Sequence, residues 1–336
     1  MEKTRKIKKK NRLKILFIVE LLIVVLLLGV VFLITKIDAI ENYELENVVQ
    51  NDFEDENIDN YQNIAIFGVD SRANDLQKNT RSDAIIIASI NKKTKKVKLT
   101  SVYRDTYVHI EGHDFTKITH AYAYGGPDLA VNTLNENFDL DIQDFVTVNF
   151  SALTNVIDEL GGITLRIRKE EKKYVNAYTR DVARINGMDY TYIKKAGKQT
   201  VTGVQATAYC RVRYTAGGDY TRAKRQRKVI KAILEKAKHS NPKVLYDVLN
   251  SLLPQIYTSL STSDILHLMV SVFSYEIEQS RGFPYKLEGT YTGGMFINQP
   301  VTLESNVVRL HKKLFETRKF QPSATVKKYS GIIEGI

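Results

Sequence analysis

A series of short, β-branched apolar segments that alternate with amphipathic ones is the feature that most limits how this chain can fold. The pattern predicts strands over residues 63–70, 83–91, 96–105, 144–150 and 163–167. It predicts helices over residues 127–138 and 151–160, the second capped by Ser151 and ended by Gly161 and Gly162. Strands that alternate with helices favour an α/β fold. We therefore expect a mixed sheet covered by helices on both faces, an α/β/α sandwich.

Other parts of the chain are less evenly patterned. Residues 168–200 are polar and rich in Tyr and Lys, and we expect an excursion or flap there. Around Arg211 and Arg213 we expect an extended segment, in which these two side chains project to the same side. From residue 219 onward helical spacing predominates. The predicted helices cover residues 219–239, 242–253, 261–277 and 301–316.

The N-terminus predicts a membrane anchor. Residues 1–14 contain eight Lys or Arg and one Glu, and the run Ile15–Ile34 is apolar apart from Glu20. Twenty helical residues span about 30 Å, the thickness of a hydrocarbon core, and no small-residue cleavage pattern follows. We expect a cytoplasmic basic tail over 1–14 and one transmembrane helix over 15–35. The rest would lie outside the cell membrane of a single-pass protein.

After the predicted anchor, an acidic segment is followed by a basic one. Residues 38–59 contain nine acids and no Lys or Arg, which predicts an acidic extracytoplasmic stalk over 36–60. The whole chain carries +11 and residues 60–336 carry +13, so the domain expected over 61–336 should bind an anionic ligand or surface. An extracytoplasmic position disfavours nucleic acid as that partner. The single cysteine, Cys210, excludes an internal disulfide framework.

Charged residues gather where the predicted strands end. Asp70 closes the first strand and Asp83 opens the second, so both carboxylates can meet at one edge of the sheet. Two carboxylates with phosphate oxygens are a common way to hold Mg²⁺, whereas a strand-end carboxylate often bonds only to nearby backbone amides. Arg81 precedes Asp83, and Arg104 ends the third strand. Spacing leaves the metal site and the turn carboxylates both open.

A second cluster lies in the stretch "AYCRVRYTAGGDYTRAKRQRK", residues 208–228. On a helix that begins near Asp219, this residue shares one face with Arg222, Arg225 and Gln226, while Lys224, Arg227 and Lys228 point elsewhere as solvated cations. Guanidiniums suit a pyrophosphate, because they donate forked hydrogen bonds and stay charged. Asp219 can act as a general base or only orient Arg222.

Several motifs in order give the chain a family resemblance: "GVDSR", "RSDAIII", "SVYRDTYV", "KITHAYAYGGP", "DELGGITLRI" and the stretch 208–228. Over residues 62–235 the chain resembles the LytR–CpsA–Psr family of membrane-anchored wall-polymer transferases. That resemblance implies a hydrophobic tunnel for a polyprenyl chain and an arginine-rich mouth for its pyrophosphate. It also implies transfer of a glycopolymer, of the teichoic acid or capsular polysaccharide type, to a muramyl hydroxyl of peptidoglycan.

The resemblance also assigns roles to individual residues. It implies Mg²⁺ as cofactor, held by Asp70 and Asp83, and a catalytic segment with Asp219, Arg222 and Gln226. The pyrophosphate ligands that it implies, together with Arg225 from the helix face, are Arg81, Arg104, Lys117, Arg211 and Arg213. Tyr103 departs from the family pattern, which usually has Pro before the Arg-Asp pair.

Three alternatives remain at this level. A polyprenyl-pyrophosphate hydrolase would use the same residues with water as acceptor. A non-catalytic lipid-binding or regulatory protein would need the tunnel and the arginines but not Asp219. A transcriptional regulator would have only residues 1–14 in the cytoplasm for DNA contact, and these are better explained as a topology signal.

Overall fold

The computed structural model describes residues 43–49, 51, 56–71, 76–77 and 79–336. The predicted basic tail and transmembrane helix fall outside these residues. Within the described residues, no helix combines the length and the apolar character that crossing a membrane requires. All the described residues belong to one compact unit, residues 42–336.

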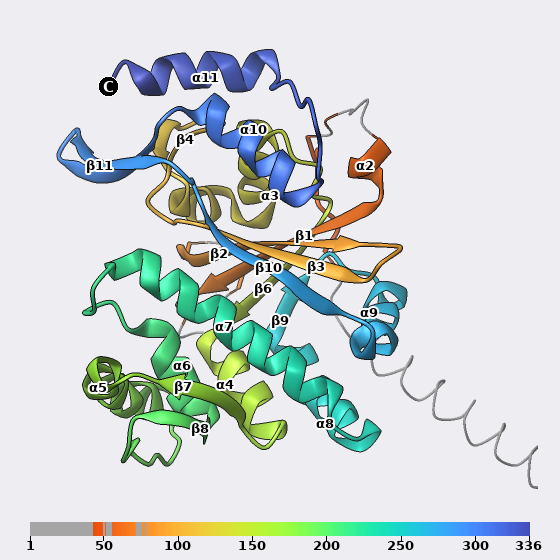
Figure 1. Cartoon of the computed structure of the whole chain (residues 1–336), viewed down its shortest axis with the longest axis vertical. Coiled ribbons are helices and arrows are strands. Elements are labelled where there is room, and N and C mark those ends of the chain that lie inside the picture. The colour runs from red at the N-terminus through yellow and green to blue at the C-terminus, as the bar shows by residue number, and fades with distance from the viewer. Residues whose placement is uncertain (1–42, 50, 52–55, 72–75, 78) are drawn as a thin grey trace, which may run out of the picture. The chain divides into compact units, whose positions relative to one another are not determined.

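A six-stranded mixed sheet forms the centre of this unit (Figure 1). Its strands lie in the order β10, β3, β2, β1, β6, β9, and the pairs β1–β6 and β3–β10 are parallel while the others are antiparallel. The strand bounds are Tyr61–Val69 (β1), Ser82–Asn91 (β2), Lys96–Val102 (β3), Asp144–Asn149 (β6), Ile256–Thr258 (β9) and Glu276–Phe283 (β10). The predicted mixed sheet is therefore confirmed.

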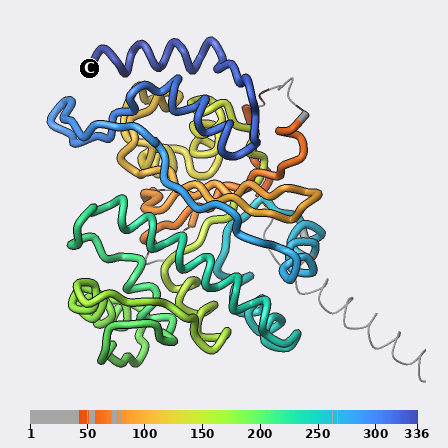
Figure 2. Tube along the Cα trace, viewed as in Figure 1, coloured from red at the N-terminus to blue at the C-terminus, as the bar shows by residue number. Residues whose placement is uncertain are grey.

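Helices cover both faces of the sheet, as Figures 1 and 2 show. Above it in this view lie α3 (Thr119–Phe138), α10 (Leu303–Leu314) and α11 (Ala324–Glu334). Below it lie α4 (Phe150–Glu159), α5 (Lys169–Asn186), α6 (Gly203–Arg211), α7 (Gly218–Lys238) and α8 (Pro242–Leu252). Two short helices, α2 (Glu56–Asp59) and α9 (Thr262–Val270), and the 3₁₀ turns Leu253–Gln255 and Ser271–Phe273 complete the helical elements that the structure describes.

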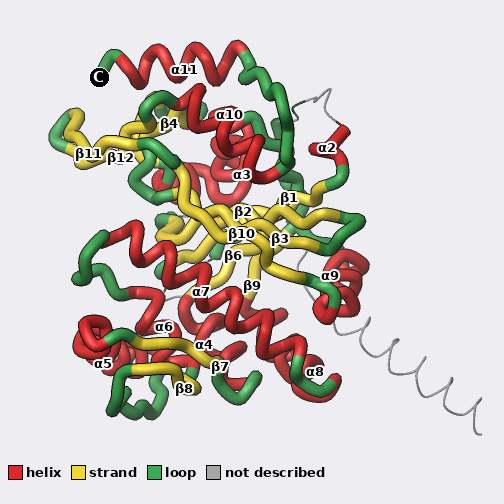
Figure 3. The backbone as a smooth tube through the Cα atoms, viewed as in Figure 1, coloured by secondary structure: helices red, strands yellow, loops and turns green. Residues whose placement is uncertain are grey.

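Three two-stranded sheets accompany the main one (Figure 3). They pair β4 (Tyr107–Ile110) with β5 (Asp114–Lys117), β7 (Ile163–Ile167) with β8 (Gly197–Val201), and β11 (Leu287–Thr292) with β12 (Met295–Pro300). The strand predicted over 163–167 thus exists but does not join the main sheet. With α5 and α6 it encloses a second apolar core, separate from the core between the main sheet and α3.

The other predicted strands coincide with β1, β2, β3 and β6 to within three residues at each end. In β2, Ile85, Ile86 and Ile87 are all buried, because helices cover both faces of the sheet and every position along the strand meets apolar neighbours. Such continuous burial produced the unbroken apolar run in the sequence.

The prediction for residues 168–200 was wrong. Most of this segment is the 18-residue helix α5, which buries Val175, Thr179, Val182 and Ala183 against the second core. Their spacing is helical, but one of the four is a Thr and the apolar stripe they form is narrow. The sequence pattern therefore did not indicate a helix. The extended segment predicted around Arg211 is in part the last turn of helix α6.

Two helix boundaries also differ from the expectation. Helix α4 is capped by Asn149, whose Oδ1 accepts from the Ala152 amide at 2.8 Å, and not by Ser151. Helix α3 consists of two helical parts separated by a non-helical break at Gly125 and Gly126, so the predicted helix over 127–138 is its second part and the first part, from Thr119, was not predicted.

The region after α8 contains more strand than expected. The segment predicted as one helix over 261–277 is helix α9 followed by a 3₁₀ turn and the start of β10. Strands β9, β10, β11 and β12 all lie in a part of the chain where helical spacing predominates. Pairing with β3 and β6 provides the hydrogen bonds that local sequence does not reveal.

The predicted acidic stalk is folded against the domain in its described parts, residues 43–49, 51 and 56–60, and Ile58 of the last part is in the core. The Tyr43 amide donates to the Thr258 carbonyl at 3.2 Å, and the Tyr43 hydroxyl donates to Asp128. The Val49 amide donates to Asn132 Oδ1 at 2.8 Å. This segment is therefore an integral part of the domain and not a free linker.

Candidate functional site

The two carboxylates predicted to meet do meet, because of the way β1 and β2 pair. The strands are antiparallel, with Val69 opposite Ser82, so Asp70 and Asp83 follow and open adjacent strands at one sheet edge. Both line a polar cavity of about 310 Å³. Its lining is completed by Arg104, Phe150, Tyr178, Cys210, Arg211, Arg213, Arg222 and Gln226. We call this cavity the mouth.

Asp83 is the centre of the charges in the mouth. Its Oδ1 accepts from Arg104 Nη1 at 2.6 Å, and its Oδ2 accepts from Arg213 Nη2 at 3.2 Å and lies 3.9 Å from Arg222 Nη1. Burial alone would raise the pKa of Asp83, but the charges of these three arginines outweigh it and lower that pKa below its ordinary value. The carboxylate is therefore ionised and holds three guanidiniums at one point.

Arg222 comes from the first turns of helix α7 and is almost fully buried. Its Nη2 donates to the Asp83 carbonyl at 3.0 Å and lies 2.7 Å from Asp219 Oδ1, an ion pair too oblique for a hydrogen bond. Burial, with Arg213 and Arg104 nearby, lowers the pKa of Arg222 below the ordinary arginine value. Asp219 does not line the mouth itself but lies behind Arg222, with its Oδ1 3.7 Å from Arg104 Nε.

Arg211 enters the mouth from the end of helix α6. Its guanidinium carbon lies 4.9 Å from the ring centre of Phe150 and 5.9 Å from that of Tyr178, and its Nη2 is 3.6 Å from Asp70 Oδ2. Aromatic rings that flank a guanidinium fix its plane. Although the backbone here is helical, Arg211 and Arg213 do line the same cavity, as predicted.

Two predicted ligands lie beside the mouth. Lys117 Nζ pairs with Asp105 Oδ1 at 3.1 Å, and Asp105 in turn lies 3.8 Å from Arg104 Nε. Arg81 is exposed just before β2. Burial of His120, together with the charges of Arg81 and Lys117, lowers the pKa of that imidazole. Arg81 and Lys117 therefore both contribute positive charge to this side of the site.

Arg225 lies outside the mouth. Its guanidinium is buried and donates to Glu171 Oε1 at 3.1 Å, to the Val212 carbonyl at 2.8 Å and to Thr215 Oγ1 at 2.6 Å. These contacts fasten helix α5 and the 212–215 loop to α7. This position argues against the predicted role of Arg225 as a pyrophosphate ligand.

We expect Arg225→Ala to destabilise the protein by about 3–5 kcal/mol, because it leaves the buried Glu171 carboxylate without its buried partner. Chemical denaturation of the full chain measures this change. Lys224→Ala, an exposed neighbour on the same helix, serves as the control and should change stability by less than about 0.5 kcal/mol. If Arg225→Ala kept full stability but lost ligand binding, Arg225 would belong to the site after all.

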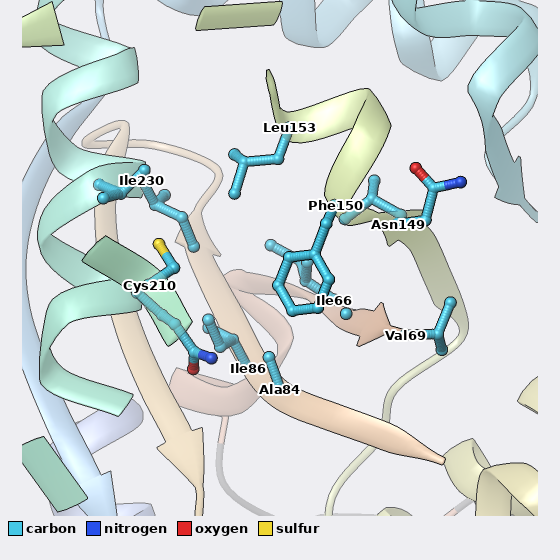
Figure 4. Close-up of a pocket in the computed structure, with 13 residues that line it drawn as sticks. Ile66, Val69, Ala84, Ile86, Asn149, Phe150, Leu153, Cys210 and Ile230 are labelled. Carbon is cyan, nitrogen blue, oxygen red and sulfur yellow. The ribbon is translucent and has the colours of Figure 1, made fainter. Parts of the chain in front are cut away.

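An apolar cavity of about 110 Å³ adjoins the mouth (Figure 4). It lies between the sheet and helices α4, α6 and α7, and its lining residues are Ile66, Gly68, Val69, Ala84, Ile86, Val148, Asn149, Phe150, Leu153, Cys210, Gln226, Val229 and Ile230. Phe150, Cys210 and Gln226 line both cavities and form a neck between them. A ligand with an anionic head and an apolar tail can fill both.

Sequence reasoning missed Phe150, Tyr178 and Cys210 as residues of the site. The Cys210 thiol is buried at the neck, and burial raises its pKa to about 12, which keeps it protonated. The signal for Phe150 was its place directly after a strand, at the edge where Asp70 also lies. Arg227 was taken for a solvated cation but is buried, and it donates from Nε to Ser280 Oγ at 2.9 Å.

The donor set of the mouth fits a magnesium ion only with help from a ligand. Among the described residues, no group of three or more His, Cys, Asp or Glu side chains could hold a metal. Asp70 and Asp83 do offer two carboxylates in one cavity, and Mg²⁺ commonly takes one or two carboxylates together with phosphate oxygens and water. The residues present therefore fit an ion that arrives with a phosphorylated ligand.

The fold and the two joined cavities define an α/β/α protein whose site accommodates an amphiphile with an anionic head. The chain belongs to the LytR_cpsA_psr family, whose model matches residues 29–312. It is similar to the polyisoprenyl-teichoic acid–peptidoglycan teichoic acid transferase TagT of Bacillus subtilis (strain 168). The two are 32% identical over 234 residues, which are 68% of this chain and 70% of that protein.

Other relatives agree. The TagU transferase of Bacillus licheniformis is 31% identical over 240 residues, 70% of this chain and 71% of that one. The solved structure of TagT bound to LI-WTA has a TM-score of 0.64 at 26% identity and covers 81% of this chain and 98% of its own. A structure of TagT with bound octaprenyl pyrophosphate lipid has a TM-score of 0.60 at 24% identity, over 82% of this chain and 100% of that one, and shares the fold.

Proposed function

We propose that this protein transfers a glycopolymer from a polyprenyl-pyrophosphate carrier to a muramyl hydroxyl of peptidoglycan. The observation that carries the proposal is the neck, where an apolar cavity opens directly into a mouth rich in arginine. The names of the relatives, as teichoic acid transferases, support the same reaction class. Which polymer is carried is left open, since teichoic acid and capsular polysaccharide share the pyrophosphate linkage.

The charges suit this donor. A pyrophosphate diester carries two negative charges, and the mouth presents four guanidiniums, those of Arg104, Arg211, Arg213 and Arg222, to its contents. Three of them already converge on Asp83, so they are held in place before a ligand arrives. Preorganised donors stabilise charge that develops during the reaction without the cost of rearrangement.

The reaction is a substitution at phosphorus. The acceptor hydroxyl oxygen attacks the sugar-linked phosphorus, the bond from that phosphorus to the bridging oxygen breaks, and the lipid monophosphate leaves with the bond's electron pair. We assign the hydroxyl proton to Asp219. Its Oδ1 is buried beside Arg222 and Arg104 while the side chain remains 22% exposed, which leaves Oδ2 for the acceptor to approach. Because the donor already contains a phosphoanhydride, no ATP is required.

Asp70 and Asp83 would hold Mg²⁺ against the pyrophosphate, and the ion would add positive charge where the leaving phosphate becomes more negative. Gln226, at the neck, faces the junction of the pyrophosphate with its lipid. The proposal also includes the N-terminal anchor and an extracytoplasmic domain, because both the lipid carrier and the acceptor would be found on that side of the membrane.

Acceptor dependence tests the function. Full-length protein, incubated with a polyprenyl-pyrophosphate-linked disaccharide, should form a phosphodiester-linked product only when peptidoglycan oligosaccharides are present. Release of sugar phosphate at the same rate without acceptor would mean a hydrolase. Tight donor binding without release or transfer would mean a lipid-binding or regulatory protein. Mass spectrometry of the peptidoglycan fraction distinguishes the three results.

We expect Asp83→Ala to reduce transfer at least tenfold and to weaken its dependence on Mg²⁺ concentration, because the substitution removes one proposed metal ligand and releases three guanidiniums. Activity is measured over a Mg²⁺ titration, with circular dichroism to confirm folding. Asp189→Ala, an exposed carboxylate elsewhere, is the matched control. An unchanged Mg²⁺ response in a folded Asp83→Ala protein would contradict the metal assignment.

A further inference from the structure

A third cavity lies on another face of helix α7. It is a groove of about 510 Å³ between α7, Tyr209 of α6 and the two-stranded sheet β7–β8, and Figure 1 shows β7 running beside α7. The lining residues are Thr164, Leu165, Arg166, Lys198, Tyr209, Lys228, Lys231, Ala232, Glu235, Lys236 and His239. We call it the lysine groove. None of these residues lines the mouth or the apolar cavity.

The groove carries a large positive charge that the fold does not neutralise. Five of its residues are cations, Arg166, Lys198, Lys228, Lys231 and Lys236, and none forms an ion pair with a carboxylate in the described part of the chain. Its one acid, Glu235, pairs instead with Lys238 at 3.5 Å, which is outside the groove. A concave surface lined with one sign of charge concentrates counter-ions.

Three of these cations occupy positions that are unfavourable for the fold alone. Arg166 on β7 lies directly opposite Lys198 on β8, and like charges in such cross-strand pairs are destabilising. On α7, burial and the nearby charges of Lys224, Arg168 and Arg225 lower the pKa of Lys228 and together outweigh the opposite effect of Glu171. An anion in the groove would relieve both repulsions.

We propose that the lysine groove binds the phosphate-bearing polymer portion of the donor, at a distance from the pyrophosphate. This inference rests on the proposed function and deepens it, since it makes the polyanionic chain itself a recognised part of the substrate. Lys231 follows Gln226 of the neck by five residues, or about 7.5 Å along the helix axis. A polymer of a few repeats is long enough to reach from one face of α7 to the other.

The shape of the groove favours a chain over a membrane surface. A flat layer of lipid head groups contacts cations that protrude, whereas these cations surround a hollow with an apolar floor of Leu165, Tyr209 and Ala232. Leu165 and Tyr209 are buried. A sugar-phosphate or polyol-phosphate chain alternates CH groups with phosphates. Its CH groups can pack on the apolar floor while its phosphates pair with the surrounding cations.

The experiment measures binding of fluorescent poly(glycerol phosphate) to the full-length protein in a neutral detergent, by anisotropy across a salt titration. The double variant Lys228→Gln, Lys231→Gln should weaken binding about tenfold and flatten the salt dependence. The matched control, Lys312→Gln with Lys328→Gln, removes the same charge from exposed positions on α10 and α11 and should bind as the wild type does. Neutral dextran and phosphatidylglycerol vesicles are titrated in parallel.

Each other result overturns the inference. Equal losses in the two double variants would mean that net charge alone attracts the polymer. Groove-dependent binding of the vesicles but not of the polymer would mean a membrane contact. Transfer from a lipid-linked disaccharide separates this inference from the proposed function. If only the groove inference is wrong, transfer from the disaccharide carrier persists and polymer binding does not depend on the two lysines. If the proposed function is wrong, no acceptor-dependent product forms, whatever the groove binds.

Discussion

Ala84→Phe is expected to weaken the capture of a long-chain polyprenyl pyrophosphate by roughly 10²–10³-fold. Ala84 lines the apolar cavity between the sheet and α7, and a benzyl group there occupies much of its volume of about 110 Å³. Each excluded isoprene unit has five carbons, and burying one carbon contributes about 0.8 kcal/mol, so about 4 kcal/mol is lost per unit. The dissociation constant of a fluorescent long-chain carrier measures the effect.

Chain length supplies the internal control for this prediction. A carrier analogue with a very short lipid should bind Ala84→Phe and the wild type about equally, because its tail does not enter the cavity. Ile86→Leu, which keeps the volume at a neighbouring position of the same lining, should bind both carriers normally. An equal loss of affinity for the long and the short carrier would mean that the substitution affects the mouth or folding. No loss of affinity for either carrier would mean that the lipid tail binds outside this cavity.

Asp219→Asn is expected to lower the turnover of the transfer reaction by about 10²–10⁴-fold while donor binding largely persists. Asparagine is nearly isosteric, so it keeps the packing beside Arg222 but cannot accept the proton of the acceptor hydroxyl. Single-turnover kinetics and a titration with donor measure both quantities.

A different pattern would assign Asp219 a positioning role. In that role the carboxylate, which pairs with Arg222 and does not line the mouth, would act only by holding that guanidinium. Turnover that stays within tenfold of the wild type, with weaker donor binding, would show that the transfer needs no side-chain base. Asp219→Glu distinguishes the two roles, because a carboxylate base displaced by one methylene group should retain part of the transfer activity.

The sequence predicts four of the six main-sheet strands, β1, β2, β3 and β6, but misses β9, β10 and helix α5, for physical reasons. Strands buried on both faces leave long apolar runs, as in β2, and such runs are hard to mistake. Helix α5 buries a narrow stripe that includes a Thr and a charged Glu171, and this stripe is hidden among lysines and tyrosines. Its burial depends on α6, which lies later in the chain than a local window over α5 reaches.

The polar site was predictable to a similar extent. Strand ends brought Asp70 and Asp83 to one edge, and the helix face correctly grouped Arg222 with Gln226. The same face included Arg225, because a helical wheel does not say which neighbour covers each side of the helix. The partner of Arg225 is Glu171, 54 residues earlier in the chain, and its recognition requires the folded arrangement of α5 on α7.

The apolar cavity left one signal in the sequence that was not used. Gly68 and Ala84 are opposite each other on β1 and β2, beside the larger residues Ile66, Val69 and Ile86 of the same cavity lining. Two small residues side by side leave a space between the sheet and the helices that cover it. Larger side chains at these two positions would fill that space. A Cβ added at Gly68 would lie only 3.0 Å from that of Ala84, so the pairing itself is close.

The neck formed by Phe150, Cys210 and Gln226 has a consequence for what happens after the transfer. Under the proposed function, the lipid tail would lie on the apolar side of the neck, with the same contacts there before and after the polymer has left. The spent carrier, still bearing one phosphate, would then compete with fresh donor for the same position, and its residence time would set an upper limit on the rate of successive cycles. In a cell, the enzyme would depend on prompt recycling of its own by-product.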